Sequence, residues 1–270
     1  PLHDFNLNVV NTIKILEAIR INNPKCRFVN LSSAAVYGNP KILPIKENSS
    51  LTPLSPYGYH KFYAEQICKE YYYLHNIEVI NLRLFSVYGE HLKKQLFWDL
   101  YQKSKKAKNE VELYGTGNET RDFIYIKDLV KAINLVIQNC SFNGDAVNIA
   151  SGIESPIKKV AKIFMTEVNP DLKIKFNNLV KQGDPLYWKA DISYLQSLGY
   201  KNDYSVDVII QQLNQKNIPV YGVKLLKAYP VSYEGITLDN AQTDAVTEMS
   251  VTFAYDRFVP EGPLSSTGSA

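Results

Sequence analysis

The chain has 270 residues, of which 45% are hydrophobic, and its formal net charge is +3. This size and apolar fraction allow one large or two small domains with a substantial core, and the small, scattered charge is not typical of a nucleic-acid-binding protein. The three cysteines lack metal-ligand spacing, and no apolar run reaches the ~18 residues of a membrane span. We therefore expect a reduced, cytoplasmic protein without a metal, a nucleic-acid partner or a membrane segment.

The first two elements are a helix and a strand. Residues 8–18 predict an amphipathic helix, because apolar residues recur every three or four positions. Residues 28–33 form an apolar run that ends in two serines and then reaches a turn at Gly38. Open α/β sheets place their ligand crevices at the carboxyl ends of the strands. Ser33 is therefore a candidate site residue.

The next segment, residues 55–61, predicts the start of a long helix that carries a phenol and an ammonium. Ser55 can cap the free amides, and Pro56 suits the first helical position. Tyr57 and Lys61 are four residues apart and share one helix face. A cation beside a phenol favours the phenolate, which can then act as a base. The alternative, a solvated lysine near a half-buried tyrosine, is the commoner meaning of this spacing when it stands alone.

The rest of the chain first alternates between helices and strands and then changes pattern. Expected elements are a helix at 61–75, strands at 78–84, 111–114 and 121–126, helices at 95–107 and 127–138, and a strand with its turn at 147–152. This alternation predicts an α/β fold with a parallel sheet covered on both faces. Residues 219–258 have the alternation of β-strands, and residues 259–270 predict a flexible tail.

Five short sequence motifs support a family assignment for the first part of the chain. SSAAVYG, SPYGYHKFYAEQ, LRLFSVYG, RDFIYIKDLVKAI and VNIASG occur in this order. They resemble the motifs of the extended short-chain dehydrogenases/reductases, the NAD-dependent nucleotide-sugar epimerases and dehydratases, over about residues 1–213. The resemblance implies a Rossmann-like parallel sheet, with residues 1–150 as a dinucleotide-binding domain that lacks its first strands and residues 151–214 as a small substrate-binding lobe. It also implies that residues 205–214 form one of the last helices.

The resemblance also assigns roles to residues. Ser33, Tyr57 and Lys61 are the implied catalytic residues. Tyr57 takes the proton from a sugar hydroxyl while hydride leaves for NAD. Lys61 holds the nicotinamide ribose and lowers the pKa of Tyr57, and Ser33 bonds the sugar oxygen. Asn8 and Phe85 are the other implied NAD contacts. No G-x-x-G-x-x-G, the turn that holds the NAD pyrophosphate, occurs in the 270 residues. The sequence therefore predicts weak or absent NAD binding by this polypeptide.

Ser86, Arg121 and Lys181 are the implied contacts to a nucleotide-sugar substrate. Ser86 replaces the usual Asn of the family, and Lys181 replaces an Arg. The Lys181 ammonium can still attract a phosphate, but it cannot form the paired hydrogen bonds of a guanidinium. For Arg121, contact with the substrate diphosphate is favoured over a surface salt bridge. Dehydratases carry an Asp-Glu pair where Ala34 and Ala35 stand, which argues against 4,6-dehydration. Reductase and decarboxylase relatives remain alternatives.

The end of the chain resembles a different family. LLKAYPVSYEGITLD and VTFAYDRFV resemble the closing strands of tail-tube proteins from contractile phage tails, over about residues 218–258. The alternative is an extra sheet appended to an epimerase. Two partial resemblances in one chain favour a fusion or mosaic joined near residues 214–218.

These observations predict epimerase-type oxidoreduction of a nucleotide sugar by a homodimer, in polysaccharide biosynthesis. The competing class is a structural tail-tube subunit of the virion tail, whose last strands assemble into hexameric rings while the front part is not catalytic. A non-catalytic sugar-nucleotide sensor is a third alternative.

Overall fold

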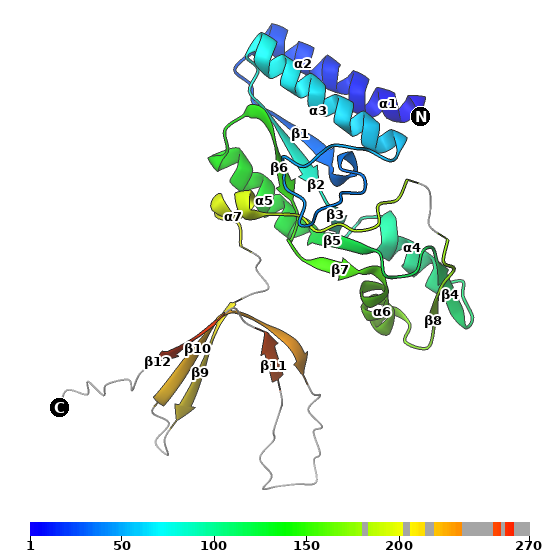
Figure 1. Ribbon diagram of the computed structural model, residues 1–270, viewed down its shortest axis with the longest axis vertical. Helices are drawn as coiled ribbons and strands as arrows, with labels where there is room; N and C mark the ends of the chain where they lie inside the picture. Colours follow the sequence, from blue (N-terminus) through cyan, green and yellow to red (C-terminus); the bar gives the residue numbers. More distant parts are fainter. Residues whose placement is uncertain (180–182, 202–205, 214–218, 234–250, 255–256, 262–270) are drawn as a thin grey trace, which may run out of the picture. The chain divides into compact units, whose positions relative to one another are not determined.

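The computed structural model describes residues 1–179, 183–201, 206–213, 219–233, 251–254 and 257–261. The chain divides into two compact units, Pro1–Lys201 and Asn202–Ala270 (Figure 1). None of the helices in these ranges has the length and apolar character of a membrane span.

The first unit is built on a parallel sheet. Its strands are β1 (Phe28–Ser33), β2 (Val79–Leu84) and β6 (Asn143–Ile149), in the order β1-β2-β6. All pairings in this sheet are parallel, with Ser33 opposite Leu84 and Leu84 opposite Ile149. The carboxyl ends of the three strands therefore meet at one edge, as predicted for the ligand-binding side of an α/β sheet.

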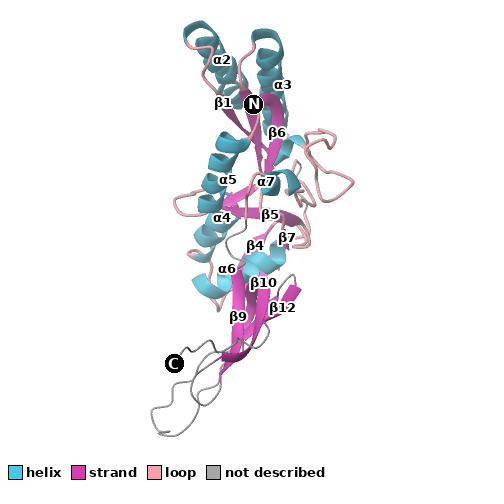
Figure 2. Ribbon diagram, turned by 90° about the vertical axis from the view of Figure 1, so that its left-hand side faces the viewer, coloured by secondary structure: helices cyan, strands magenta, loops and turns pink. Residues whose placement is uncertain are grey.

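Helices cover both faces of this sheet, as the alternation of elements predicts. The chain begins with α1 (Leu2–Phe5), which continues through the π-helical turn η1 (Asn6–Val10) into α2 (Asn11–Asn22). Helix α3 (Pro56–His75) packs across all three strands, and α2 lies beside α3 (Figures 1 and 2). Helices α5 (Ile126–Asn139) and α7 (Ser193–Ser197) contact β6.

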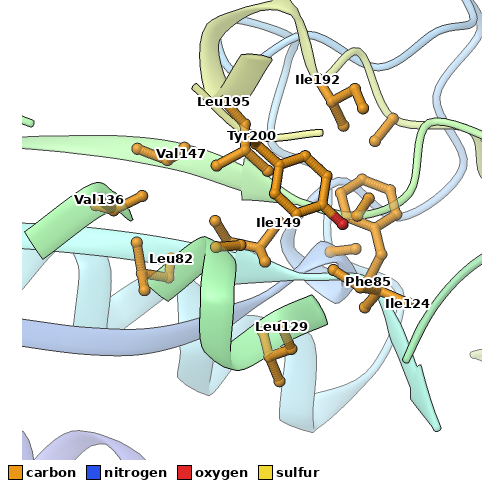
Figure 3. Close-up of a cluster of buried hydrophobic side chains, with 14 of the residues drawn as sticks. Leu82, Phe85, Ile124, Leu129, Val136, Val147, Ile149, Ile192, Leu195 and Tyr200 are labelled. Carbon is orange, nitrogen blue, oxygen red and sulfur yellow. The ribbon is translucent and has the colours of Figure 1, made fainter. Parts of the chain in front are cut away.

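The largest core cluster lies between the sheet and helices α5 and α7. Leu82, Val147 and Ile149 of the sheet meet Val136 of α5 and Leu195 of α7 (Figure 3). All five side chains are fully buried. The neighbouring positions in these strands point the other way, because side chains alternate along a strand. Among them, Arg83 of β2 bonds Glu65 of α3.

A second group of elements follows the sheet. Strands β3 (Ser86–Tyr88), β5 (Thr120–Tyr125) and β7 (Glu154–Pro156) form one small sheet, and β4 (Glu110–Leu113) pairs with β8 (Lys173–Phe176). Helices α4 (Gln95–Ser104) and α6 (Ile157–Val168) contact each other. Their core is separate from the first and consists of Leu100, Val111, Leu113, Ala161, Met165 and Leu172.

The second unit is a β-structure. Its strands are β9 (Val206–Leu213), β10 (Pro219–Tyr233), β11 (Val251–Ala254) and β12 (Arg257–Glu261), and β10 pairs antiparallel with each of the others. The strand prediction for residues 219–258 is thus confirmed where the structure describes it. Strand β12 extends beyond the expected boundary at residue 258. The register of β10 against β11 shifts between Pro230 and Ser232, in agreement with a bend at a residue that cannot donate to the ladder.

The helix predicted for residues 205–214 is wrong, because Val206–Leu213 forms strand β9. This stretch, VDVIIQQL, is rich in β-branched residues, which favour strands, and its pairing with β10 satisfies its backbone groups. The predicted facing of Val251, Phe253 and Tyr255 lies outside what the structure describes.

Candidate active site

The start of α3 is defined by its cap and by a close contact. Ser55 is extended, and its hydroxyl accepts a hydrogen bond from the Gly58 amide at 3.2 Å, with Pro56 at the first helical position. A Cβ added at Gly58 would lie 2.7 Å from the carbonyl oxygen of Ala35. Only glycine therefore lets the helix approach the turn after β1 this closely, and that approach brings Tyr57 to the end of the strand.

Ser33 ends β1 at the carboxyl edge of the sheet. Its hydroxyl accepts a hydrogen bond from the Ala35 amide at 3.2 Å, which starts the 3₁₀ turn at Ala34–Val36. The Ser33 side chain also lies close enough to the Tyr57 hydroxyl to lower the pKa of the phenol. The structure thus brings together two of the three residues predicted to be catalytic.

Lys61, the third of these residues, lies one turn after Tyr57. Its ammonium is 5.8 Å from the centroid of the Tyr57 ring. The same group donates a hydrogen bond to the Leu31 carbonyl at 2.8 Å. Lys61 therefore ties α3 to β1 beside the phenol.

The pKa of Tyr57 does not move in the direction expected from a neighbouring cation. Burial raises the pKa of Tyr57, and the neighbouring Ser33 side chain opposes that rise without cancelling it. Burial also lowers the pKa of Lys61. The side chain of Tyr57 remains 43% exposed, so its desolvation concerns the hydroxyl end and leaves the ring accessible.

Asp4 is a charged neighbour that the sequence did not indicate. Its negative charge adds to the rise in the pKa of Tyr57 and partly opposes the lowering of the pKa of Lys61. Its carboxylate also contacts Nδ1 of His60, which precedes Lys61. Asp4 and His60 are 56 positions apart, and nothing in the local pattern of either segment predicts the contact.

The other residues predicted to contact NAD occupy different surroundings. The Asn8 amide donates hydrogen bonds to the main-chain oxygen and to Oδ1 of Asp4, both at 3.0 Å. Asn8 is therefore bound to its own helical segment. Phe85, between β2 and β3, is only 5% exposed and packs edge-on against Trp188, with 5.8 Å between ring centroids. Ser86 follows as the first residue of β3 and is half-buried.

Arg121 of β5 lies beside Trp188. Its Nη1 donates to the Thr120 carbonyl at 2.8 Å, and its guanidinium carbon lies 5.5 Å from the Trp188 ring centroid. Burial lowers the pKa of Arg121, and the negative charges of Asp184 and Glu119 oppose this lowering. Trp188 was not singled out from the sequence, because no motif includes it.

The predicted substrate-binding segment at 181–184 is described only in part. Lys181 lies outside the described residues. A Cβ added at Gly183 would lie 3.3 Å from Cβ of Ser55, so this segment contacts the start of α3. Asp184 in turn interacts with Arg121. The two described residues of the motif, Gly183 and Asp184, therefore lie near the start of α3 and near Arg121 of β5.

Asp122 anchors the elements around Arg121. The carboxylate is fully buried and accepts hydrogen bonds from the Ser151 amide and hydroxyl at 2.8 Å, the Gly152 amide at 3.0 Å and the Ala190 amide at 3.1 Å. It thereby joins β5 to the turn after β6 and to the segment after Trp188. Burial raises the pKa of Asp122 to about 6, although these four donors oppose the shift.

A parallel sheet with helices on both faces, and a serine, a tyrosine and a lysine at the carboxyl edge, define the first unit as an α/β protein of the short-chain dehydrogenase/reductase type. Residues 1–150 match the family described as "NAD dependent epimerase/dehydratase family", and the chain belongs to that family. Residues 158–261 match a second family, "Phage tail tube protein". This second match begins within the first unit, well before the expected residue 218.

Curated relatives and solved structures agree with the family. A putative UDP-glucose 4-epimerase of Methanocaldococcus jannaschii is 35% identical over 210 residues, which cover 74% of this chain and 66% of that protein. An uncharacterised UDP-glucose epimerase of Bacillus subtilis is 31% identical, with 71% of this chain and 60% of that protein covered. The chain therefore spans between 60% and 66% of the length of these two relatives.

Two structures have the same TM-score of 0.66. The UDP-N-acetylglucosamine 4-epimerase of Methanobrevibacter ruminantium, in complex with UDP-N-acetylmuramic acid, is 27% identical and covers 75% of this chain and 66% of its own. The UDP-glucuronic acid 4-epimerase of Bacillus cereus, in complex with UDP-glucuronic acid and NAD, is 28% identical and covers 72% of this chain and 62% of its own.

Proposed function

We propose that the first unit carries the proton-transfer and substrate side of an NAD-dependent nucleotide-sugar epimerase. The observation that carries this proposal is the close approach of the start of α3 to the end of β1, which places Tyr57 beside Ser33 and lets Lys61 donate a hydrogen bond to the Leu31 carbonyl. The curated epimerase relatives support the reaction class.

In this proposal Tyr57 removes the proton from a sugar hydroxyl. Only the phenolate can accept that proton, and burial raises the pKa of Tyr57, so the phenol must first release its own proton to solvent and the resulting negative charge must be stabilised. The neighbouring Ser33 side chain favours the phenolate, because it lowers the pKa of Tyr57. The Lys61 ammonium adds a positive charge on the same helix face. Ser33 would also orient the sugar oxygen and stabilise developing negative charge.

The residues present fit the nicotinamide end of NAD better than its pyrophosphate. Tyr57 is accessible, Lys61 is half-buried beside it, and Phe85 lies at the edge of the sheet. When bound, NAD would supply the hydride acceptor. Asn8 uses its amide within its own helix, and the 270 residues contain no glycine-rich turn for the phosphates. We therefore propose Tyr57, Lys61 and Phe85 as the NAD contacts, with Asn8 contributing only if it leaves Asp4.

For the substrate, we propose that Arg121 and Lys181 bind the diphosphate and that Ser86 contacts the nucleotide sugar. The planar guanidinium of Arg121 can form paired hydrogen bonds with phosphate oxygens. Its burial against Trp188 would strengthen them. Polysaccharide biosynthesis in the cytoplasm is the proposed setting, and the absence of an Asp-Glu pair at Ala34 and Ala35 favours epimerisation over dehydration.

We further propose a homodimer formed through α2 and α3. These helices leave large apolar and aromatic side chains exposed, including Ile15 at 47%, Ile21 at 66% and Tyr63 at 43%. Burial of such side chains against a second copy would remove apolar surface from water.

The second unit supports a separate candidate function, assembly as in a tail tube. The family match at residues 158–261 and the antiparallel pairing of β10 with three strands favour it. In that case the chain is a fusion, with a dinucleotide-binding domain at residues 1–150, a small substrate-binding lobe after it, and the β-structure that begins beyond Lys201. Stacked hexameric rings in electron micrographs would support this function, and a purely dimeric particle would oppose it.

The test of the enzymatic proposal is the substitution Tyr57→Phe. UDP-, GDP- and dTDP-sugars are incubated with NAD, and epimer formation is measured by NMR. Loss of the ionisable oxygen should reduce turnover by about 10²–10⁴-fold. The matched control is Tyr59→Phe, because Tyr59 lies on the same helix and is similarly exposed, at 45%. Near-normal turnover in the Tyr57 variant would remove this residue from the mechanism.

A further inference from the structure

A fully buried ion pair lies behind the candidate active site, between α3 and the sheet. Glu65 of α3 is 0% exposed and Arg83 of β2 is 2% exposed. The guanidinium binds the carboxylate through two hydrogen bonds, Nε to Oε1 at 3.0 Å and Nη2 to Oε2 at 2.7 Å. This bidentate geometry restricts both the distance and the orientation of the helix relative to the strand.

The remaining donors of Arg83 extend the contact to two further elements. Its Nη1 donates to the Tyr37 hydroxyl at 2.8 Å and to the Glu47 carbonyl at 2.7 Å. The Tyr37 hydroxyl then donates to Oδ1 of Asn148 on β6, at 2.7 Å. The pair is thus held by the turn after β1 and by the third strand of the sheet, and its charges are not left unpartnered.

The same carboxylate also connects to the strand that carries Ser33. The Ser32 hydroxyl donates to Oε1 of Glu65 at 2.5 Å. Ser32 immediately precedes Ser33, and Glu65 lies one turn beyond Lys61 and two turns beyond Tyr57 on the same helix face. The Glu65 side chain of α3 therefore bonds directly to β1, and these are the two elements whose side chains meet in the candidate site.

We propose that Ser32, Glu65 and Arg83 are positioning residues, which set the separation of the Ser33 hydroxyl and the Tyr57 phenol. They contact neither substrate nor cofactor and act only through the placement of β1 and α3. Their catalytic consequence rests on the proposed function, whereas their effect on the phenol does not. If the strand is released from the helix, Ser33 moves away from the phenol, and the pKa of Tyr57 rises because the Ser33 side chain opposes the effect of burial.

The test uses Ser32→Ala in the full chain, because this change leaves the ion pair intact and removes only the bond between β1 and Glu65. A 3-fluorotyrosine is incorporated at position 57, and its ionisation is followed by ¹⁹F NMR against pH. We expect the ionisation constant to fall by about tenfold, which corresponds to a rise of about one pKa unit. In an active preparation, kcat should fall while KM changes little.

Two further substitutions separate the explanations. Ser33→Ala removes the hydroxyl that lowers the pKa of Tyr57 and should therefore give the largest rise in that pKa. Ser104→Ala is the control, because it removes a hydroxyl that is also buried, at 6% exposure, and lies far from the site residues in the sequence. This hydroxyl donates a hydrogen bond to the Tyr101 carbonyl at 2.9 Å. It should leave the ionisation of residue 57 unchanged.

The outcomes are distinct. A shift in Ser33→Ala with none in Ser32→Ala would overturn the positioning role and leave the proposed site intact. No shift in either variant would overturn both the positioning role and the contact on which the site depends. A shift in both, without epimer formation by the unsubstituted chain, would support positioning and count against the proposed function.

Discussion

The buried Glu65–Arg83 pair makes a quantitative prediction about stability. Removing one partner, as in Glu65→Leu or Arg83→Met, leaves the other charge buried without a counter-charge. Each single substitution should lower the free energy of unfolding by about 3–5 kcal/mol. For the unit of Pro1–Lys201, in which each kcal/mol corresponds to roughly 2–4 °C, the melting temperature should fall by about 6–20 °C.

The double variant should be much less damaging than the two single changes together. With both charges absent, no uncompensated ion remains. The groups that lose a partner are then the Ser32 hydroxyl, the Tyr37 hydroxyl and the Glu47 carbonyl. At about 1 kcal/mol for each lost hydrogen bond, the double variant should lose about 2–4 kcal/mol. It should therefore be about as stable as either single variant.

Denaturation in urea, followed by tryptophan fluorescence, measures these differences, because both tryptophans, Trp98 and Trp188, lie in the first unit. The matched control is Arg27→Gln with Glu78→Gln. This pair joins the beginnings of β1 and β2 at 3.0 Å but is solvent-exposed, so its loss should hardly change the midpoint. If the double variant at Glu65 and Arg83 loses the full sum of the two single losses, the two charges do not act as a unit and the reasoning fails.

Three other predictions follow from the site. Lys61→Ala should reduce both NAD affinity and turnover, and a loss of thermal stability alone would make Lys61 structural. Titration calorimetry of the 270-residue chain with NAD should give weak or no binding, whereas a micromolar dissociation constant would mean that another segment supplies the phosphate site. For Asp122, the pKa in the folded protein is about 6 and lies above its ordinary value of 3.8. Protonated Asp122 therefore stabilises the folded chain below pH 4. As the pH rises through 6, the free energy of unfolding should fall by up to about 3 kcal/mol. Urea midpoints measured from pH 4 to 7 should show this loss in the natural chain and not in Asp122→Asn, and equal slopes would contradict it.

Sequence alone determined most of the local structure of the first unit. The cap at Ser55 and the proline after it define the beginning of α3, and apolar alternation identifies the strands that end at Ser33 and Leu84. These signals are local, because caps and periodic side-chain patterns act within a few residues of the chain. The ordered motifs likewise predicted the family, and with it the candidate residues Tyr57 and Lys61.

Local pattern was insufficient where pairing decides the structure. Residues 205–214 were expected to form a helix because they resemble one of the last helices of the epimerase family, but Val206–Leu213 pairs with β10 as a strand. A short apolar segment can adopt either form, and the partner that satisfies its backbone hydrogen bonds selects between them.

The tertiary structure alone decided the surroundings of the site. Asp4, Trp188 and the Glu65–Arg83 pair belong to no local pattern, and each meets the site through contacts with distant parts of the chain. Their effects come from burial: a charge removed from water alters neighbouring pKa values and demands a partner, and only the folded packing determines which groups lose water together. The sequence therefore predicted which residues carry the candidate chemistry, whereas the fold determined how acidic they are and what holds them in place.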